Sequence, residues 1–176
     1  MNSKKAVYFC SSSFGIDPKY NEVARQIVHA AASKGYGAVS GGSFRGTMGV
    51  IADAANECGV ENVGVLPSFM KGLEHPHLTE LGWTETMSER KEAMREGTSL
   101  AVALPGGIGT LDELMETYTL AKLKRYQGKV IAINCYGFYD SLKAVLDQYV
   151  AQGMLDEASR SLISFPETVE EFLNLI

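Results

Sequence analysis

The sequence predicts a Rossmann-like, doubly wound α/β domain, in which helices cover both faces of a parallel sheet. Short β-rich segments alternate with amphipathic helical segments along the whole chain. Two of the β-rich segments, Leu100–Leu104 and Val130–Ile133, are continuous apolar runs, which are typical of strands buried on both faces. The chain has 176 residues, 45% of them hydrophobic and 21% charged. These values predict one globular domain over residues 1–176.

The first half of the chain predicts three strands and two helices. A short β-rich run forms the strand Lys5–Cys10, and a polar turn follows it. Apolar residues at helical spacing predict a helix over Lys19–Lys34, which Gly35 can end. The pattern continues with a strand at Gly37–Ser40, a small-residue helix at Gly46–Cys58, a strand at Asn62–Leu66 and a loop at Pro67–Gly82.

The second half continues the alternation up to the last residues. Apolar periodicity predicts most of these helices, and the two continuous apolar runs predict the strands between them. The expected elements are helix Met87–Glu96, strand Leu100–Leu104, helix Thr110 to about Tyr126, strand Val130–Asn134, helix Tyr139–Gln152 and helix Glu167–Leu175.

Composition and charge exclude several classes of function. The net charge of −5 gives no positive field for bulk nucleic acid or an anionic membrane surface, and no apolar run is long enough to span a bilayer. The three cysteines, Cys10, Cys58 and Cys135, show no disulfide or metal-ligand spacing. We therefore expect a cytoplasmic protein with no nucleic-acid partner, no membrane attachment and no metal site.

Two glycine-rich segments follow predicted strands and carry the main chemical signal. They are Ser40–Gly49 and Pro105–Glu113. In doubly wound sheets ligands bind at the carboxyl ends of the strands, where glycines let the backbone approach an anion and helix N-termini hold it. Both segments therefore predict a phosphate site. A purely structural alternative exists for the second segment, because Thr110 and Glu113 have the spacing of a capping box.

Well-known phosphate-binding and nucleophile motifs do not match the sequences of these two segments. A P-loop over Gly41–Gly46 would need lysine next, where Thr47 stands, and a dinucleotide fingerprint from Gly107 would need glycine at Asp112. A nucleophile elbow around Ser43 fails as well, because Arg45 occupies the position of its last glycine. These mismatches weaken nucleoside-triphosphatase, dinucleotide-binding and serine-hydrolase interpretations.

The predicted helix Met87–Glu96 places two cations beside an apolar stripe. Met87 and Met94 share one face, and Arg90 and Lys91 flank it. For Lys91 the favoured interpretation is an aliphatic stem along the surface with its ammonium in water. For Arg90 this interpretation and a bidentate contact with an anion are equally supported.

Four motifs, in order along nearly the whole chain, resemble the LOG (Lonely Guy) phosphoribohydrolases, long labelled lysine decarboxylases. The segment Pro105–Glu113 resembles the family signature P-G-G-x-G-T-x-x-E, and Phe9–Ser13 resembles its opening F-C-G-S-S. Ser40–Gly49 resembles G-G-G-x-x-G-L-M-G, and Met87–Met94 resembles M-x-x-R-K-x-x-M.

The resemblance implies hydrolysis of a nucleoside 5′-monophosphate, such as AMP or a cytokinin riboside 5′-monophosphate, to free base and ribose 5-phosphate. It implies that Glu113 and Arg90 are the catalytic pair and that no cofactor is needed. It also implies a homodimer with a small-molecule nucleotide as substrate. By the same motif matches, phosphate and substrate contacts are expected from Gly106, Gly107, Gly109, Thr110, Lys91, Ser12, Gly42 and Met87.

Two other functions remain open at this point. A non-catalytic nucleotide-binding or sensing module on the same fold would bind AMP without needing Glu113. A decarboxylase would need a lysine that forms a Schiff base with pyridoxal phosphate, and no lysine lies in a recognisable setting for that cofactor.

Overall fold

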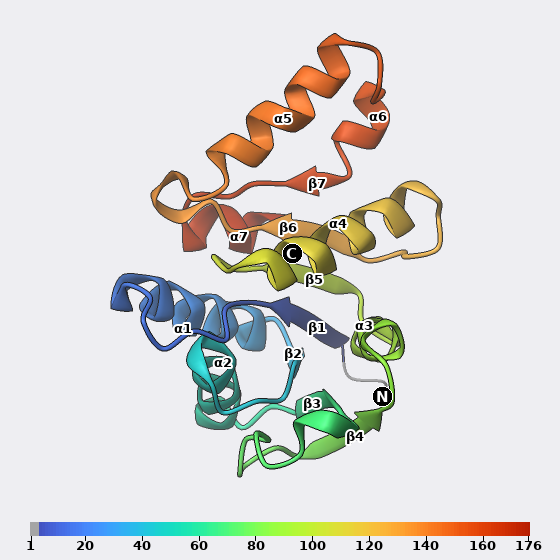
Figure 1. Ribbon diagram of the computed structural model, residues 1–176. Coiled ribbons are helices and arrows are strands. Elements are labelled where there is room, and N and C mark those ends of the chain that lie inside the picture. Colours follow the sequence, from blue (N-terminus) through green and yellow to red (C-terminus); the bar gives the residue numbers. More distant parts are fainter. Residues whose placement is uncertain (1–3) are drawn as a thin grey trace.

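A single seven-stranded sheet forms the centre of the protein (Figure 1). The computed structural model describes residues 4–176. The strand order is β4-β3-β2-β1-β5-β6-β7, and all neighbouring strands run parallel. The strands are β1 (Lys4–Phe9), β2 (Tyr36–Ser40), β3 (Asn62–Pro67), β4 (Glu80–Thr84), β5 (Leu100–Ala103), β6 (Lys129–Ala132) and β7 (Ile163–Ser164).

Helices cover both faces of this sheet, as the sequence predicts. Successive residues of β1 point to opposite faces, so Ala6 and Tyr8 pack with α1, α2 and α7, whereas Val7 and Phe9 pack with α3, α4 and α5. The helices are α1 (Pro18–Ser33), α2 (Gly46–Glu57), α3 (Met87–Arg95), α4 (Ile108–Lys122), α5 (Asp140–Ala151), α6 (Glu157–Arg160) and α7 (Val169–Leu175). The doubly wound α/β fold class is confirmed.

The direction of winding reverses between β1 and β5. Strands β2, β3 and β4 extend the sheet to one side of β1, and the chain then returns to place β5 on the other side of it. The loops that leave β1 and β5 therefore diverge at the carboxyl edge of the sheet, which is where doubly wound proteins bind ligands. Both the Cys10–Ser13 turn and the Pro105–Gly109 turn lie at this point.

Three elements differ from the sequence prediction. Strand β4 lies partly inside the expected loop Pro67–Gly82, and it gives no apolar run because it is the edge strand and none of its residues is buried. Strand β7 has two residues and α6 has four, which is too short for a periodic pattern. These elements are held by tertiary pairing, as in the parallel pairing of β7 with β6.

The structural alternative for the second glycine-rich segment, a capping box from Thr110 to Glu113, does not form. Helix α4 begins at Ile108 with Gly107 as its N-cap, so Thr110 already lies inside the first turn. A capping box forms instead at the start of α3, where the Thr86 hydroxyl accepts from the Glu89 N–H and the Glu89 carboxylate accepts from the Thr86 N–H. Glu113 is therefore free of a capping role.

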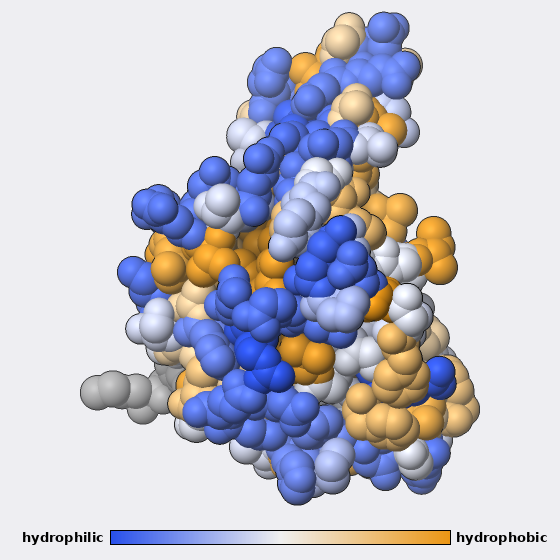
Figure 2. Space-filling view, turned by 90° about the vertical axis from the view of Figure 1, so that its left-hand side faces the viewer, coloured by the Kyte–Doolittle hydropathy of each residue, from blue (hydrophilic) through white to orange (hydrophobic). Residues whose placement is uncertain are grey.

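Helices α5 and α6 form an arm that projects from the body of the molecule (Figure 1). Leu146 is the one buried side chain that α5 contributes, and Val145 and Tyr149 are exposed. On the face shown in Figure 2 much of the surface is hydrophilic, and apolar residues collect in patches, some where the arm meets the body and another at the lower right of the view. Within residues 4–176, no helix has the length and apolar character needed to cross a membrane.

Candidate active site

A pocket of about 400 Å³ opens at the carboxyl edge of the sheet, between the turns that follow β1 and β5 and one side of α3. Eight of the ten predicted site residues line it: Ser12, Met87, Arg90, Lys91, Gly107, Gly109, Thr110 and Glu113. Gly42 and Gly106 lie outside its lining. Gly42 packs against β3, where an added Cβ would meet Gly64 and Leu66, and Gly106 packs against Thr110.

Arg90 lines the pocket and is buried, with 8% of its surface exposed. Its Nε donates to the Val65 carbonyl oxygen in β3 (2.9 Å), and its Nη1 donates to Glu113 Oε1 (3.2 Å). Gly41 makes this placement possible, because a Cβ on Gly41 would lie 2.1 Å from Arg90 Nη2. Gly41 was not among the predicted site residues, although it stands beside the predicted Gly42.

Glu113 faces Arg90 from the second turn of α4 and is also 8% exposed. Burial of its carboxyl raises the pKa to about 7, an effect that the positive charge of Arg90 opposes. The Asp112 carboxylate raises this pKa further, and the Lys91 ammonium lowers it. Near neutral pH both protonation states of Glu113 are accordingly populated, which suits a group that handles charge or protons at a reacting centre.

The turn before α4 leaves backbone donors open toward the pocket. No side chain caps the helix at Gly107, so its first N–H groups have no capping partner. A Cβ on Gly107 or Gly109 would meet nothing within 4 Å, so no contact within the fold requires glycine there. The Thr110 hydroxyl is buried and has no hydrogen-bond partner among the described residues. These groups together form a donor-rich cradle at the positive end of a helix dipole.

The turn after β1 forms the opposite wall and is held by α2. The Thr47 N–H donates to the Ser11 carbonyl oxygen (3.0 Å), and the Ser13 N–H donates to Ser11 Oγ (3.0 Å). Gly46 approaches this turn so closely that an added Cβ would lie 2.7 Å from Ser13 O. The close fit explains why the first glycine-rich segment is needed although it forms little of the pocket lining.

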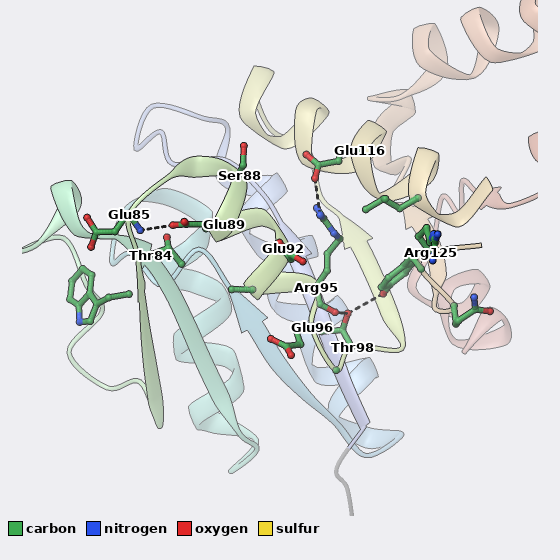
Figure 3. A pocket seen from close by; sticks show the side chains of 16 residues that line it. Thr84, Glu85, Ser88, Glu89, Glu92, Arg95, Glu96, Thr98, Glu116 and Arg125 are labelled. Carbon is green, nitrogen blue, oxygen red and sulfur yellow. Dashed lines mark hydrogen bonds and ion pairs between the residues drawn. The ribbon is translucent and has the colours of Figure 1, made fainter. Parts of the chain in front are cut away.

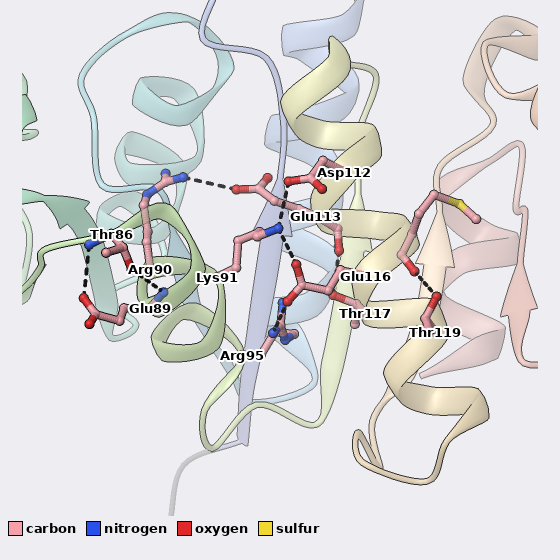
Figure 4. A network of polar contacts seen from close by, with 11 residues as sticks. Thr86, Glu89, Arg90, Lys91, Arg95, Asp112, Glu113, Glu116, Thr117 and Thr119 are labelled. Carbon is pink, nitrogen blue, oxygen red and sulfur yellow. Dashed lines mark hydrogen bonds and ion pairs between the residues drawn. The ribbon is translucent and has the colours of Figure 1, made fainter.

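Lys91 differs from its predicted state. Its side chain is 13% exposed, and its ammonium forms an ion pair with Asp112 Oδ2 (2.9 Å) and a second with Glu116 (Figure 4). The prediction of an ammonium in open water is therefore wrong. The hydrogen bonds that the Lys91 ammonium donates to Glu116 and Asp112 raise the lysine pKa, which keeps the amine charged. A charged, doubly paired amine is unsuited to a Schiff base with pyridoxal phosphate.

Methionine side chains supply the apolar part of the lining. They come from three segments that are distant in sequence: Met48 in α2, Met70 after β3, and Met87 with Met94 in α3. Met94 is buried and Met87 is exposed at the rim. Neither Met48 nor Met70 was among the predicted site residues: Met48 lies within the matched segment Ser40–Gly49 without a predicted role, and no motif includes Met70. Flexible thioether side chains adapt their packing to planar or branched apolar groups.

A larger pocket of about 1060 Å³ lies beside α3 and continues to the end of α4 (Figure 3). Its walls carry glutamates, including Glu85, Glu92 and Glu96, and it contains neither of the glycine-rich turns nor the Arg90–Glu113 pair. We therefore assign the functional site to the smaller pocket. Among residues 4–176, no three His, Cys, Asp or Glu side chains lie close enough together to hold a metal ion.

Comparison with known proteins finds relatives that match most of this chain. The family model described as "Possible lysine decarboxylase" matches residues 48–176. The cytokinin riboside 5′-monophosphate phosphoribohydrolase LOG2 of Arabidopsis thaliana is 30% identical over 98% of this chain and 82% of its own length. The cytokinin riboside 5′-monophosphate phosphoribohydrolase of Mycobacterium tuberculosis is 32% identical over 86% of this chain and 82% of its own.

Solved structures share the fold at lower identity. The molybdenum cofactor carrier protein of Chlamydomonas reinhardtii superposes with a TM-score of 0.74 at 17% identity, covering 98% of this chain and 95% of that one. The predicted resemblance is confirmed by the family model and by the relatives that span nearly all of this sequence. The chain belongs to the LOG family of cytokinin riboside 5′-monophosphate phosphoribohydrolases, the family whose model is described as "Possible lysine decarboxylase".

Proposed function

We propose that the protein hydrolyses the N-glycosidic bond of a nucleoside 5′-monophosphate, with AMP or a cytokinin riboside 5′-monophosphate as substrate. The observation that carries this proposal is the buried contact between Arg90 and Glu113, directly beside an uncapped, glycine-rich helix start. The names of the relatives support the same reaction. A binding module would need the cradle but would not need a buried carboxyl with a raised pKa.

The 5′-phosphate fits the cradle made by Gly107, Gly109 and Thr110. Open N–H groups at a helix start and the unpartnered Thr110 hydroxyl offer hydrogen bonds to an anion. Ser12 faces this cradle across the pocket, while Gly106 and Gly42 support the two walls from behind. The methionine lining, including Met87 at the rim, would then contact the base.

Glu113 and Arg90 act on the ribose in this proposal. The bond between C1′ and the base nitrogen breaks, the base leaves with a proton, and water supplies the hydroxyl at C1′ of ribose 5-phosphate. The transition state has oxocarbenium character, which the Glu113 carboxylate stabilises at close range in a water-poor site. Arg90 holds that carboxylate through Nη1 and is itself fixed by the Val65 carbonyl. No cofactor is required for this hydrolysis.

The test is release of free base from AMP and from an isopentenyl-type AMP analogue, quantified by chromatography. Wild type should release base, and Arg90→Ala and Glu113→Ala should each lower kcat at least 10²-fold, the scale of a lost electrostatic contact in a transition state. The matched controls are Arg25→Ala and Glu57→Ala, which remove an exposed Arg–Glu ion pair between α1 and α2. Both controls should keep wild-type rates.

Two results would contradict the hydrolase. Wild type that releases no base while AMP still raises its melting temperature would leave a nucleotide-binding module. Full activity of Glu113→Ala would remove Glu113 from the reaction. The ratio of rates for AMP and the isoprenoid analogue would then define the preferred base.

We further propose that the enzyme is a cytoplasmic homodimer. Apolar side chains of α4, α5 and the turn before α5 border a groove of about 490 Å³. Among them, Ile108, Phe138 and Val145 are exposed and Leu111 is half-buried. A monomer would leave this apolar groove in water, which is unfavourable for a soluble protein. The cytoplasmic placement rests on the free thiols of Cys10, Cys58 and Cys135.

A further inference from the structure

Helices α3 and α4 are joined by a ladder of ion pairs that continues past the Arg90–Glu113 contact (Figure 4). Lys91 contacts Asp112 and Glu116, and Arg95 contacts Glu116 Oε1 at 2.7 Å. Glu116 is also part of the wall of the larger pocket (Figure 3). The ladder thus fixes the side of α3 that carries Arg90 against the first turns of α4.

The distribution of burial within this ladder is unequal. The Lys91 side chain is 13% exposed, whereas its partner Asp112 is 59% exposed. A surface ion pair contributes little to stability, and burial of an ammonium costs free energy. A gain in stability therefore does not explain why the Lys91 ammonium is buried. Its position near Glu113 does, because its charge acts on that carboxyl.

We propose that Lys91 is a positioning residue, which together with Asp112 sets the charge state of Glu113 and holds α3 in register with α4, and that it does not bind the phosphate. This inference rests on the proposed function, since it assigns Glu113 the reactive role. Two carboxylates accept from the Lys91 ammonium, so two of its three hydrogens already have acceptors and its charge is already paired.

Four groups interact with the Glu113 carboxyl through their charges. Arg90 and Lys91 approach from α3, Asp112 is its neighbour on α4, and the Cys10 thiol faces it from the end of β1. Burial raises the pKa of the Cys10 thiol, so it stays neutral and adds no charge near pH 7. Removing the Lys91 charge should therefore raise the Glu113 pKa, and removing the Asp112 charge should lower it.

The test is a direct titration of Glu113 by carbon NMR of side-chain carboxyls in glutamate-labelled protein, with the signal assigned by Glu113→Gln. The midpoint should rise by roughly 1 pH unit in Lys91→Met, the scale for loss of a nearby opposite charge. It should fall by less in Asp112→Asn, because that side chain is more exposed. The double variant should return toward the wild-type midpoint.

The pH dependence of the rate of base release gives the second readout. Its apparent pKa should shift in the same direction as the NMR midpoint in each variant. Lys5→Met is the matched control, since it removes an ion pair with Glu61 at the start of β1, and it should move neither readout. A higher KM for nucleotide in Lys91→Met with an unmoved midpoint would overturn the inference and make Lys91 a phosphate ligand. Shifts of the same sign in Lys91→Met and Asp112→Asn would overturn it as well.

The titration is independent of turnover. If wild type releases no base, the proposed function fails, but the NMR midpoints still decide whether Lys91 and Asp112 control Glu113. If base release occurs and the midpoints of both variants equal that of wild type, the hydrolase stands and this inference fails.

Discussion

Glu113 carries a raised pKa of about 7 because its carboxyl is buried, and this has an energetic consequence at the scale of one residue. A group whose folded pKa lies above its unfolded value of 4.5 favours the folded state at low pH, and that contribution is lost as pH rises toward 7. Wild type should therefore lose about 3 kcal/mol of stability between pH 4.5 and pH 7 from this residue alone.

Glu113→Gln should lack this loss. Its free energy of unfolding should exceed that of wild type increasingly as pH rises from about 5 to about 8, as measured by urea denaturation at each pH. Glu57→Gln is the control, because Glu57 is exposed and its pKa is lowered by hydrogen bonds from Arg25 and His29. If the free energies of unfolding of wild type and Glu113→Gln differed by the same amount at every pH, burial would not raise the pKa of Glu113.

Individual contacts were only partly predictable. Residue spacing placed Arg90 beside an apolar stripe, but its contact with Glu113 spans two helices and followed from the family resemblance alone. The position of the Lys91 ammonium was mispredicted, because its partners Asp112 and Glu116 lie on another helix. Residue spacing shows which side chains share a face of one helix. It contains no information about which side chains of a neighbouring helix that face contacts.

At the scale of elements, the turn into α4 separates two kinds of glycine. Gly106→Ala should destabilise the protein, because its Cβ would lie 2.2 Å from Thr110 Oγ1. Gly109→Ala has open space around its Cβ and lies in a helix, where alanine is favoured over glycine by up to about 1 kcal/mol. Gly109→Ala should therefore keep or raise the melting temperature while raising KM for the nucleotide.

Thermal unfolding and steady-state kinetics of the two variants would check this contrast. Gly59→Ala offers a third case, since Gly59 has open space but a positive φ of 64°, so it should destabilise the fold without changing KM. An unchanged KM in Gly109→Ala would mean that the turn does not approach the phosphate closely.

Elements with strong local patterns were predictable, and elements that depend on their neighbours were not. The central strands and long helices came from apolar runs and periodicity. Edge strand β4 and the two-residue β7 became visible only through their pairing with β3 and β6. The start of α4 was displaced by two residues, because Thr110 and Glu113 matched a capping box that the chain forms elsewhere, at Thr86.

At the scale of the whole molecule, the proposed homodimer predicts a mass of about twice 19.1 kDa by light scattering at micromolar concentration. Val145→Glu places a charge in the apolar groove between α4 and α5 and should reduce the mass to that of one chain. Leu162→Glu is the control, because Leu162 has the same exposure of 41% but lies outside the groove. A wild-type mass of 19.1 kDa would exclude the dimer.

The reversal of winding between β1 and β5 also dictates when the site forms during folding. Ala6 pairs with Leu100, so the two halves of the pocket come from opposite ends of a long stretch of chain. During synthesis, a chain that has emerged only as far as α3 contains Arg90. It still lacks β5, which pairs with one side of β1. Contacts of such high sequence separation form slowly. Activity should therefore appear late in refolding, together with the last increment of native structure and not with the first helices.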